Sequence, residues 1–400
     1  MTDLSSPSLE RKSFADTRFE GFGRGKLIVG GILFVAITLG IFWYLFHYIG
    51  PGEDIPRFDQ LRWGYLLLAL PFLPIETLLS SFRMWLICRV LQPDLTFATC
   101  VKADLANSGF AVLTPSQTGG GPGQIYILNR GGAKLGTALT ISLLTFIGTM
   151  VALFGLGIYV LFLTDEDRTG ALFIGAVITL TTISALIVLS VTLPAFFRSL
   201  ISGFSRFLWQ VRGREYPLQD WWNPQQIPSQ PPADRMGPWA IWLVDILYTY
   251  RDDLRRFLRH GKLVFAGTCF LSLGFFFSRF ILAFLCVRFL GIDDSSLGEI
   301  IAIQMTLVFL TYLAPTPGSA GIAELASLSI MSGIVPHGYA PYYNLLWRFT
   351  TVYLVATIGH LVVLGTALSD MGNAYRQHPK ERPRGKVGRK KRGSPGAPFF

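Results

Sequence analysis

The sequence has few charged residues and few cysteines. Only 15% of its 400 residues are charged, against about a quarter in an ordinary soluble domain, whereas 51% are hydrophobic. This balance excludes a soluble enzyme and a disordered scaffold. The four cysteines lie in apolar segments without a Cys-x-x-Cys pair, which excludes a disulfide framework and a zinc site.

Motifs for catalysis and for cleavable targeting are also missing. The sequence contains no Walker A phosphate loop, no HExxH and no GxSxG, so no catalytic residue, metal site or cofactor is predicted. Residues 1–26 are polar, and the apolar run that follows is too long for the core of a signal peptide. We therefore expect an uncleaved first membrane helix.

Long apolar runs dominate what is present. About 20 apolar residues span a membrane as a helix, and six segments reach that length: 27–49, 63–88, 137–163, 170–193, 263–290 and 342–368. Two shorter apolar segments, 97–113 and 299–313, end in sequence rich in proline and glycine. The fold class is predicted to be an all-α polytopic membrane protein with six spanning helices and two broken, re-entrant hairpins.

The distribution of basic residues orients the chain. Lys and Arg are concentrated in three segments: 1–26, 194–262 and 371–400. They are scarce or absent in the three alternate connections: 50–62, 164–169 and 291–298. Because basic loops stay in the cytoplasm, both termini are predicted to be cytoplasmic, in a multi-pass protein of the plasma (inner) membrane.

The expected organisation is a single membrane domain at 27–370, flanked by polar ends. The basic tail 371–400 is expected to be disordered and to attract anionic lipid headgroups rather than nucleic acid, because it follows a membrane helix. Within the connection 194–262, residues 239–260 place apolar side chains at helical spacing opposite charged ones. They are predicted to form an amphipathic helix at the membrane interface.

The chain contains two similar halves, at about 63–163 and about 263–368, offset by about 200 residues. In the first half Gln124 follows Pro115 by nine residues, and in the second Glu324 follows Pro315 by nine. A helix with an embedded arginine precedes each proline, carrying Arg83 or Arg279. The charge pattern orients these two helices oppositely, so the halves are predicted to be inverted repeats.

The proline-rich and glycine-rich segments predict a helix, a break and a new helix. In the first, Gly121 is expected to be the N-cap of the new helix, with Gln124 at position N3. In the second, Gly321 is the expected N-cap and Glu324 lies at N3. Free backbone N–H groups at such a restart favour an anion.

These segments resemble a known family. The phrases 119-GGGPGQIYILNR-130 and 314-APTPGSAGIAE-324, with Leu346-Trp347-Arg348 in the last helix pair, are similar to the lysylphosphatidylglycerol synthase transmembrane, or flippase-like, family. The resemblance covers roughly 25–370. It implies a unit that moves phospholipid or lipid-linked headgroups between leaflets, here without the aminoacyl-transferase domain of some members. Many relatives carry Arg–Gly–Glu where this chain has Gly123-Gln124.

Ionisable residues at membrane depth are the main site candidates. Glu324 is interpreted either as a functional carboxylate or as a cap of its own helix, and Arg348 is expected to pair with it or to bind a lipid phosphate. Arg83 and Arg279 either contact phosphate or reach to the interface. Glu76 is a weaker candidate. The predicted substrate-binding set is Glu324, Arg348, Arg83, Arg279, Gln124, Pro115, Pro315, Gly119, Gly120, Gly121, Gly318 and Gly321.

Three function hypotheses follow. The first is a lipid flippase or transporter whose partner is a membrane phospholipid or lipid-linked substrate. The second is a membrane enzyme acting on a lipid or polyprenyl substrate in the same place. The third is a non-catalytic membrane partner protein, and a homo-oligomer is left open. The absence of catalytic motifs favours the first.

Overall fold

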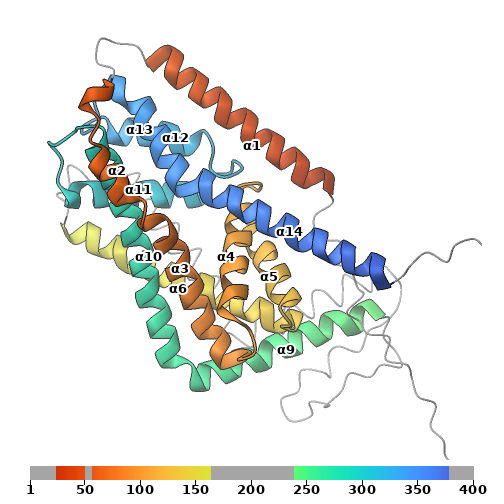
Figure 1. The fold of residues 1–400 in the computed structure, drawn as a ribbon. Coiled ribbons are helices and arrows are strands. Elements are labelled where there is room, and N and C mark those ends of the chain that lie inside the picture. Colours follow the sequence, from red (N-terminus) through yellow and green to blue (C-terminus); the bar gives the residue numbers. More distant parts are fainter. Residues whose placement is uncertain (1–23, 50–55, 164–237, 378–400) are drawn as a thin grey trace, which may run out of the picture.

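The computed structural model describes residues 24–49, 56–163 and 238–377. Over these ranges the chain is helical and forms no β-strand, as expected (Figure 1). The predicted span 170–193, the connection up to residue 237 and the tail beyond 377 lie outside the described residues. The first described helix begins at Arg24 and the last continues to Gln377, so both extend past the expected boundaries at 26 and 370.

Up to residue 163 the helices follow one another closely along the chain. They are α1 (Arg24–Tyr44) with a π-helical end η2 (Leu45–Ile49), a short 3₁₀ turn η3 (Phe58–Gln60), α2 (Trp63–Ala69), α3 (Phe72–Leu91), α4 (Phe97–Ala111), α5 (Gly120–Arg130) and α6 (Leu135–Leu163). From residue 238 onward the helices are α9 (Pro238–His260), α10 (Lys262–Phe289), α11 (Leu297–Leu313), α12 (Ile322–Met331), η6 (His337–Tyr339), α13 (Ala340–Arg348), the π-helix η7 (Phe349–Tyr353) and α14 (Leu354–Gln377).

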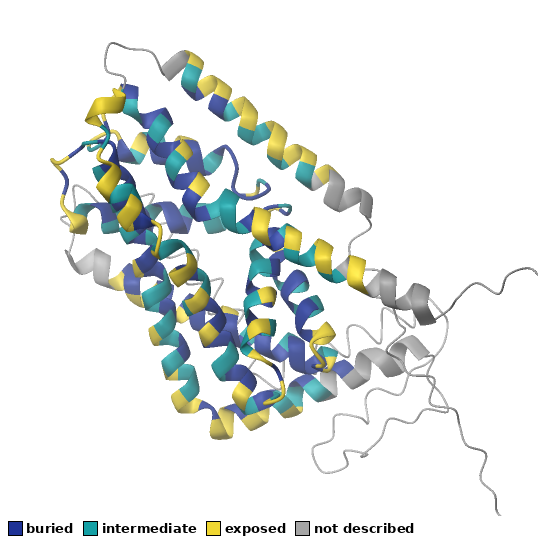
Figure 2. Cartoon of the chain, viewed as in Figure 1, coloured by how far each residue is buried: buried dark blue, intermediate teal, exposed yellow. Residues whose placement is uncertain are grey.

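Four helical stretches in the described part of the chain are long and apolar enough to cross a membrane. They are Trp63–Leu91, Leu135–Ile158, Lys262–Phe289 and His337–Thr366. The first predicted span is present as a shorter apolar helix, Gly31–His47. Large apolar side chains on α1, such as Val29, Ile32 and Leu39, are more than 60% exposed, as lipid-facing residues would be (Figure 2). The protein is a multi-pass membrane protein.

Two of the predicted spans are interrupted. The segment 63–88 is divided between α2 and α3 at Pro71, which has no backbone N–H to continue the ladder. The segment 342–368 is divided by η7, which follows Arg348 directly. Such π-helical turns are frequent at functional sites because they leave backbone groups free for other partners.

Each broken segment folds back on itself. Next to the end of α5, a side chain at Gly131 would meet those of Thr99 and Leu95, so the outer ends of α4 and α5 lie together. Met331, the last residue of α12, and Leu290, before α11, belong to one apolar cluster, so the outer ends of that pair are also close. The tips of the two pairs meet, where the Ser116 amide donates to the Ala314 carbonyl over 3.1 Å.

The described start of α1 and the end of α14 lie at one end of the molecule (Figure 1). The connections 56–62 and 291–298 lie together elsewhere, because Arg62 Nη1 donates to Asp293 Oδ1 over 2.8 Å. The hydrogen bond from Arg62 lowers the pKa of Asp293. Both connections are thus on one side, as the charge pattern predicts, whereas which side faces the cytoplasm stays a prediction.

Helix α9 forms where the amphipathic helix 239–260 was expected. Its apolar face is not left for lipid, because Tyr250, Leu254 and Phe257 are buried in the same cluster as Met84 of α3 and Ile141 of α6. Its exposed face carries charged residues, including Asp252 and Arg256. These three residues of the apolar face therefore pack on the protein, and the position of α9 at the membrane interface stays a prediction.

Candidate functional site

The second hairpin holds a fully buried ion pair. Arg348 Nε lies 2.7 Å from Glu324 Oε1, and the side chains are 3% and 0% exposed. The guanidinium also donates from Nη2 to the carbonyl of Gly318 over 2.8 Å. The expected pairing of Glu324 with Arg348 is confirmed, and it ties α13 to the tip of the hairpin.

The same carboxylate caps its own helix. Glu324 Oε2 accepts from the backbone N–H of Gly321 over 2.7 Å, which confirms Gly321 as N-cap and Glu324 at N3. Gly321 has φ +84° and Gly318 has φ +56°, in a region that favours glycine. A side chain at Gly318 would also lie 2.7 Å from the Phe34 ring of α1. Both interpretations of Glu324, cap and charged group, are therefore compatible with its geometry.

The first hairpin restarts differently from the prediction. α5 begins at Gly120 with Gly119 as N-cap, so Gln124 is inside the helix and not at N3. The tip closes early because the Gly119 N–H donates to Thr114 Oγ1 over 2.7 Å. Gln124 Oε1 instead accepts from Ser142 Oγ of α6 over 2.7 Å. The N3 position of Gln124 was a wrong prediction.

The glycines of this hairpin differ in how tightly they are packed. A Cβ added to Gly120 would lie 2.0 Å from Asn107 Oδ1 of α4, and one on Gly119 would lie 2.6 Å from the Thr114 side chain. At Gly121 the nearest atom would be 3.8 Å away, which is ordinary contact. Close approach of α5 to α4 therefore depends on Gly119 and Gly120 rather than on Gly121.

The two hairpin tips contact each other directly. Pro115 forms an isolated antiparallel bridge with Pro317, and Ser116 Oγ donates to the carbonyl of Ala314 over 3.2 Å. Ser116 has φ +50°, an uncommon conformation for a residue other than glycine. Pro115 and Pro315 are exposed at these tips. The equivalent prolines of the two halves thus lie at one junction.

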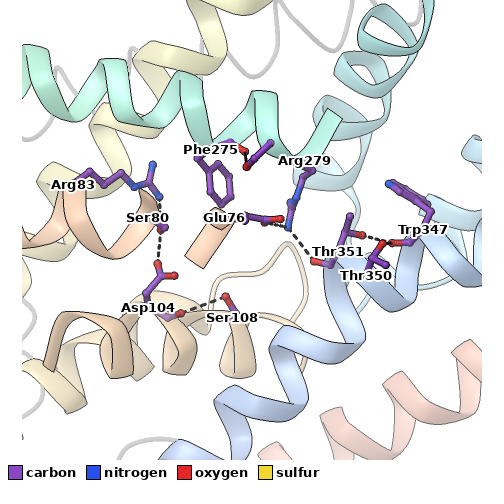
Figure 3. A network of polar contacts seen from close by, with 11 residues as sticks. Glu76, Ser80, Arg83, Asp104, Ser108, Phe275, Arg279, Trp347, Thr350 and Thr351 are labelled. Carbon is purple, nitrogen blue, oxygen red and sulfur yellow. Dashed lines mark hydrogen bonds and ion pairs between the residues drawn. The ribbon is translucent and has the colours of Figure 1, made fainter. Parts of the chain in front are cut away.

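A polar network surrounds Arg83 (Figure 3). Arg83 is 6% exposed, and its Nη1 donates to Thr149 Oγ1 over 2.7 Å and to Ser272 Oγ over 2.8 Å. Its Nη2 donates to Ser80 Oγ over 3.1 Å, and Ser80 in turn donates to Asp104 Oδ1. Arg83 is therefore buried among neighbouring helices, which supply hydroxyl acceptors for its guanidinium.

Arg279 of α10 is the arginine of the second half that corresponds to Arg83 in the first. Its Nη2 lies 2.7 Å from Glu76 Oε1 of α3 and donates to the Thr351 carbonyl over 3.0 Å. Thr351 belongs to the π-helix η7, whose altered hydrogen bonding presents this carbonyl. Because Thr351 lies three residues after Arg348, the Glu76–Arg279 pair and the Glu324–Arg348 pair are linked through a short stretch of η7 backbone.

One aromatic ring lies between the two arginines of this network (Figure 3). The guanidinium carbons of Arg83 and Arg279 are 5.2 Å and 5.4 Å from the centroid of Phe275. Both distances allow a cation–π attraction, which is stronger away from water. Phe275 therefore holds two cations near each other that would otherwise repel.

A match to a family agrees with this geometry. A sequence profile described as "Lysylphosphatidylglycerol synthase TM region" matches residues 28–359, which is most of the chain. The chain belongs to this family. Among curated proteins, none matches it significantly.

For this member of the lysylphosphatidylglycerol synthase TM family, the matched region contains both hairpins and all of the charged residues described above. The sequence had missed two participants, Ser80 and the Thr351 carbonyl, and had suggested Lys102 as one possible partner of Asp104. Asp104 is not paired with Lys102, which is exposed, but accepts from Ser80. The spacing of Ser80 and Arg83 could have revealed the serine, because residues three apart in a helix are neighbours on one face.

The charges of the network balance. Arg83 and Arg279 contribute two positive charges, and Glu76 and Asp104 two negative ones; no group of three metal ligands occurs in the described ranges. Buried charges are costly unless they have polar partners, and each of these four side chains has at least one. Chemically, the arginines of this network can exchange their present carboxylate and hydroxyl partners for the oxygens of a charged ligand.

Proposed function

We propose that this protein is a lipid transporter that moves a phospholipid or lipid-linked headgroup between the leaflets of the plasma membrane. The observation that supports it most is the network of Arg83, Arg279, Glu76 and Asp104, which joins helices of the two halves. A headgroup is polar, and its passage through a bilayer requires polar partners at mid-depth. Irregular backbone at that depth is tolerated only inside protein or next to a hydrated path.

In this proposal the two halves are inverted repeats and the hairpins are re-entrant, each entering from a different side. The termini and α9 are cytoplasmic. Transporters with inverted repeats bind their substrates near the midplane, between the repeats, and expose the site to each side in turn. The tip contact between Ser116 and Ala314 is the place where the two repeats would separate.

The proposed roles follow from the contacts. Arg83 and Arg279 bind the phosphate of the headgroup, with Phe275 between them. Glu324 and Arg348 set the shape of the second tip, because Arg348 binds the Gly318 carbonyl and Glu324 caps α12. At the start of α5 the Gly121 amide is the group proposed to bind an anion, because the Gly119 and Gly120 amides already donate to Thr114 Oγ1 and to the Gln117 carbonyl. The basic tail contributes by attracting anionic headgroups to the cytoplasmic leaflet.

Reconstitution tests this proposal. Vesicles containing the purified protein and a fluorescent phospholipid are assayed for movement of the label between leaflets, by adding an impermeant quencher. Wild-type protein should accelerate this movement, and Arg279→Gln should abolish the acceleration because Glu76 loses its partner. The matched control Arg255→Gln removes an exposed arginine of α9 and should behave as wild type. Lipid movement equal to that of empty vesicles would refute the proposal.

The same vesicles distinguish the enzyme hypothesis. Lipids extracted after incubation are compared by mass spectrometry with those of empty vesicles. An unchanged lipid that has moved supports transport. A covalently altered lipid without movement would favour an enzyme acting at this site.

A further inference from the structure

Asp104 differs from the other buried carboxylates of the described chain in its partners. Glu76 and Glu324 each contact an arginine directly, at 2.7 Å. Asp104 is 8% exposed and receives one side-chain hydrogen bond, from the hydroxyl of Ser80. A buried carboxylate without a cation in direct contact is expensive to keep ionised.

Arg83 is the complementary case. Its guanidinium is 6% exposed and binds three hydroxyl groups, which carry no charge. Its Nε is buried and has no hydrogen-bond partner. Ser80 lies between Arg83 and Asp104, accepting from one and donating to the other. Arg83 therefore has an unused donor and no anion in contact, which favours an incoming anionic oxygen.

Charge balance connects these two residues. With Asp104 ionised the network is neutral, so the entry of one phosphodiester, which carries one negative charge, would leave an uncompensated buried anion. Placing a proton on Asp104 restores neutrality. Protonating Glu76 instead would remove the anionic partner of Arg279, whereas protonating Asp104 leaves every arginine contact in place.

We propose that the network binds one phosphodiester headgroup together with one proton, and that Asp104 carries the proton. This rests on the proposed transport function and deepens it, because it assigns the substrate an anionic headgroup and the transport a coupling ion. The proton comes from water on the side to which the site is open. It is released from the carboxyl when the headgroup leaves on the other side, and no other bond changes.

The surroundings of Asp104 contain few competing proton carriers. Helix α3 presents Glu76 and Arg83, and α10 presents Arg279, each already engaged. Helix α5 carries Tyr126 and Arg130, whose side chains contact each other. Helix α14 carries His360, whose backbone packs against Gly109, five residues beyond Asp104 on α4. His360 is therefore the residue to vary as a second candidate.

A pH gradient across the vesicle membrane tests the coupling. Vesicles of phosphatidylcholine with a fluorescent phosphatidylglycerol carry wild-type protein, and the inner buffer is more alkaline than the outer one. We expect the label to accumulate in the inner leaflet, and reversing the gradient should reverse the accumulation. A fluorescent phosphatidylcholine, which is zwitterionic, should show no such asymmetry.

Variants assign the effect. In Asp104→Asn the gradient should no longer bias the label, because the amide cannot release a proton. Asp252→Asn, at an exposed carboxylate of α9, should retain the full bias. A bias that persists in Asp104→Asn would overturn the assignment, and its loss in His360→Gln alone would transfer the role to His360. A wild-type protein that moves lipid at the same rate and extent with and without a gradient would refute coupling but leave transport standing.

A second measurement does not depend on transport. Infrared difference spectra between acidic and alkaline buffers should show the carbonyl band of a protonated carboxylic acid that is absent in Asp104→Asn and present in Asp252→Asn. Adding short-chain phosphatidylglycerol should increase this band at a fixed pH, because anion and proton bind together. If the wild-type protein moves no lipid, the transport proposal fails. A spectrum without the band would then also exclude the proton site.

Discussion

At the residue scale, Glu324 shows how one carboxylate serves two structural purposes. One oxygen accepts from Gly321 N–H and the other contacts Arg348. A glutamine could keep the first contact but not the charge of the second. The pairing was predictable because both residues lie at membrane depth in the same half, where unpaired charges are costly.

We expect Glu324→Gln to destabilise the protein by about 3–5 kcal/mol, because it leaves Arg348 as an unpaired buried cation. Thermal unfolding in detergent measures the change. The double variant Glu324→Gln/Arg348→Gln should recover part of the loss, since it buries no charge. Equal unfolding temperatures for wild type and Glu324→Gln would contradict the buried ion pair.

Glycine conformation provides a second residue-scale prediction. Gly321→Ala places a side chain at φ +84° and should cost about 1–2 kcal/mol. Gly121→Ala is the matched control, because Gly121 is helical, has room for a methyl group and should gain helix propensity. The changes in the free energy of unfolding of the two variants should therefore have opposite signs. Similar destabilisation by both substitutions would show that steric crowding, rather than backbone conformation, determines the cost of adding a methyl group.

At the element scale, local sequence predicts where helices break better than it predicts which helices contact one another. Prolines and glycines at 115–121 and 315–321 predicted where helices stop, because these residues interrupt the hydrogen-bond ladder. The same reasoning misplaced Gln124, since the Thr114 hydroxyl moved the helix start. The π-helix after Arg348 has no proline or glycine to signal it. Contact between the tips depends on residues about 200 positions apart, which no local pattern encodes.

The docking of α9 on α6 is testable at a single glycine. A Cβ at Gly136 of α6 would lie 2.6 Å from the Ile246 carbonyl of α9, whereas one at Gly155 of the same helix would meet no atom within 4 Å. Gly136→Val should therefore push α9 away and Gly155→Val should not. Hydrogen exchange of α9 amides reports the change, with faster exchange expected around Tyr250 only in Gly136→Val. Unchanged exchange in Gly136→Val would refute close docking.

At the scale of the whole molecule, the sequence predicted an all-helical multi-pass protein of this family, and both are confirmed. Composition and span length were sufficient for that, because a bilayer admits few architectures. The predicted total of six spans stays a prediction, because the span 170–193 lies outside the described residues. Which side of the membrane each connection faces depends on the basic residues of the connections. Contacts within the molecule do not reveal that side.

Cysteine labelling determines this sidedness. In a background with the four native cysteines replaced by alanine, a cysteine at Asp294 lies in the connection 291–298, which is expected to be external. One at Arg259 lies on the exposed face of α9, which is expected to be cytoplasmic. An impermeant maleimide added to intact cells should label position 294 and not 259, and lysis should expose 259. Because Arg62 and Asp293 hold two connections together, a cysteine at Asp59 should label like 294. Labelling of 259 in intact cells would reverse the orientation of the chain and, with it, the side from which each hairpin enters.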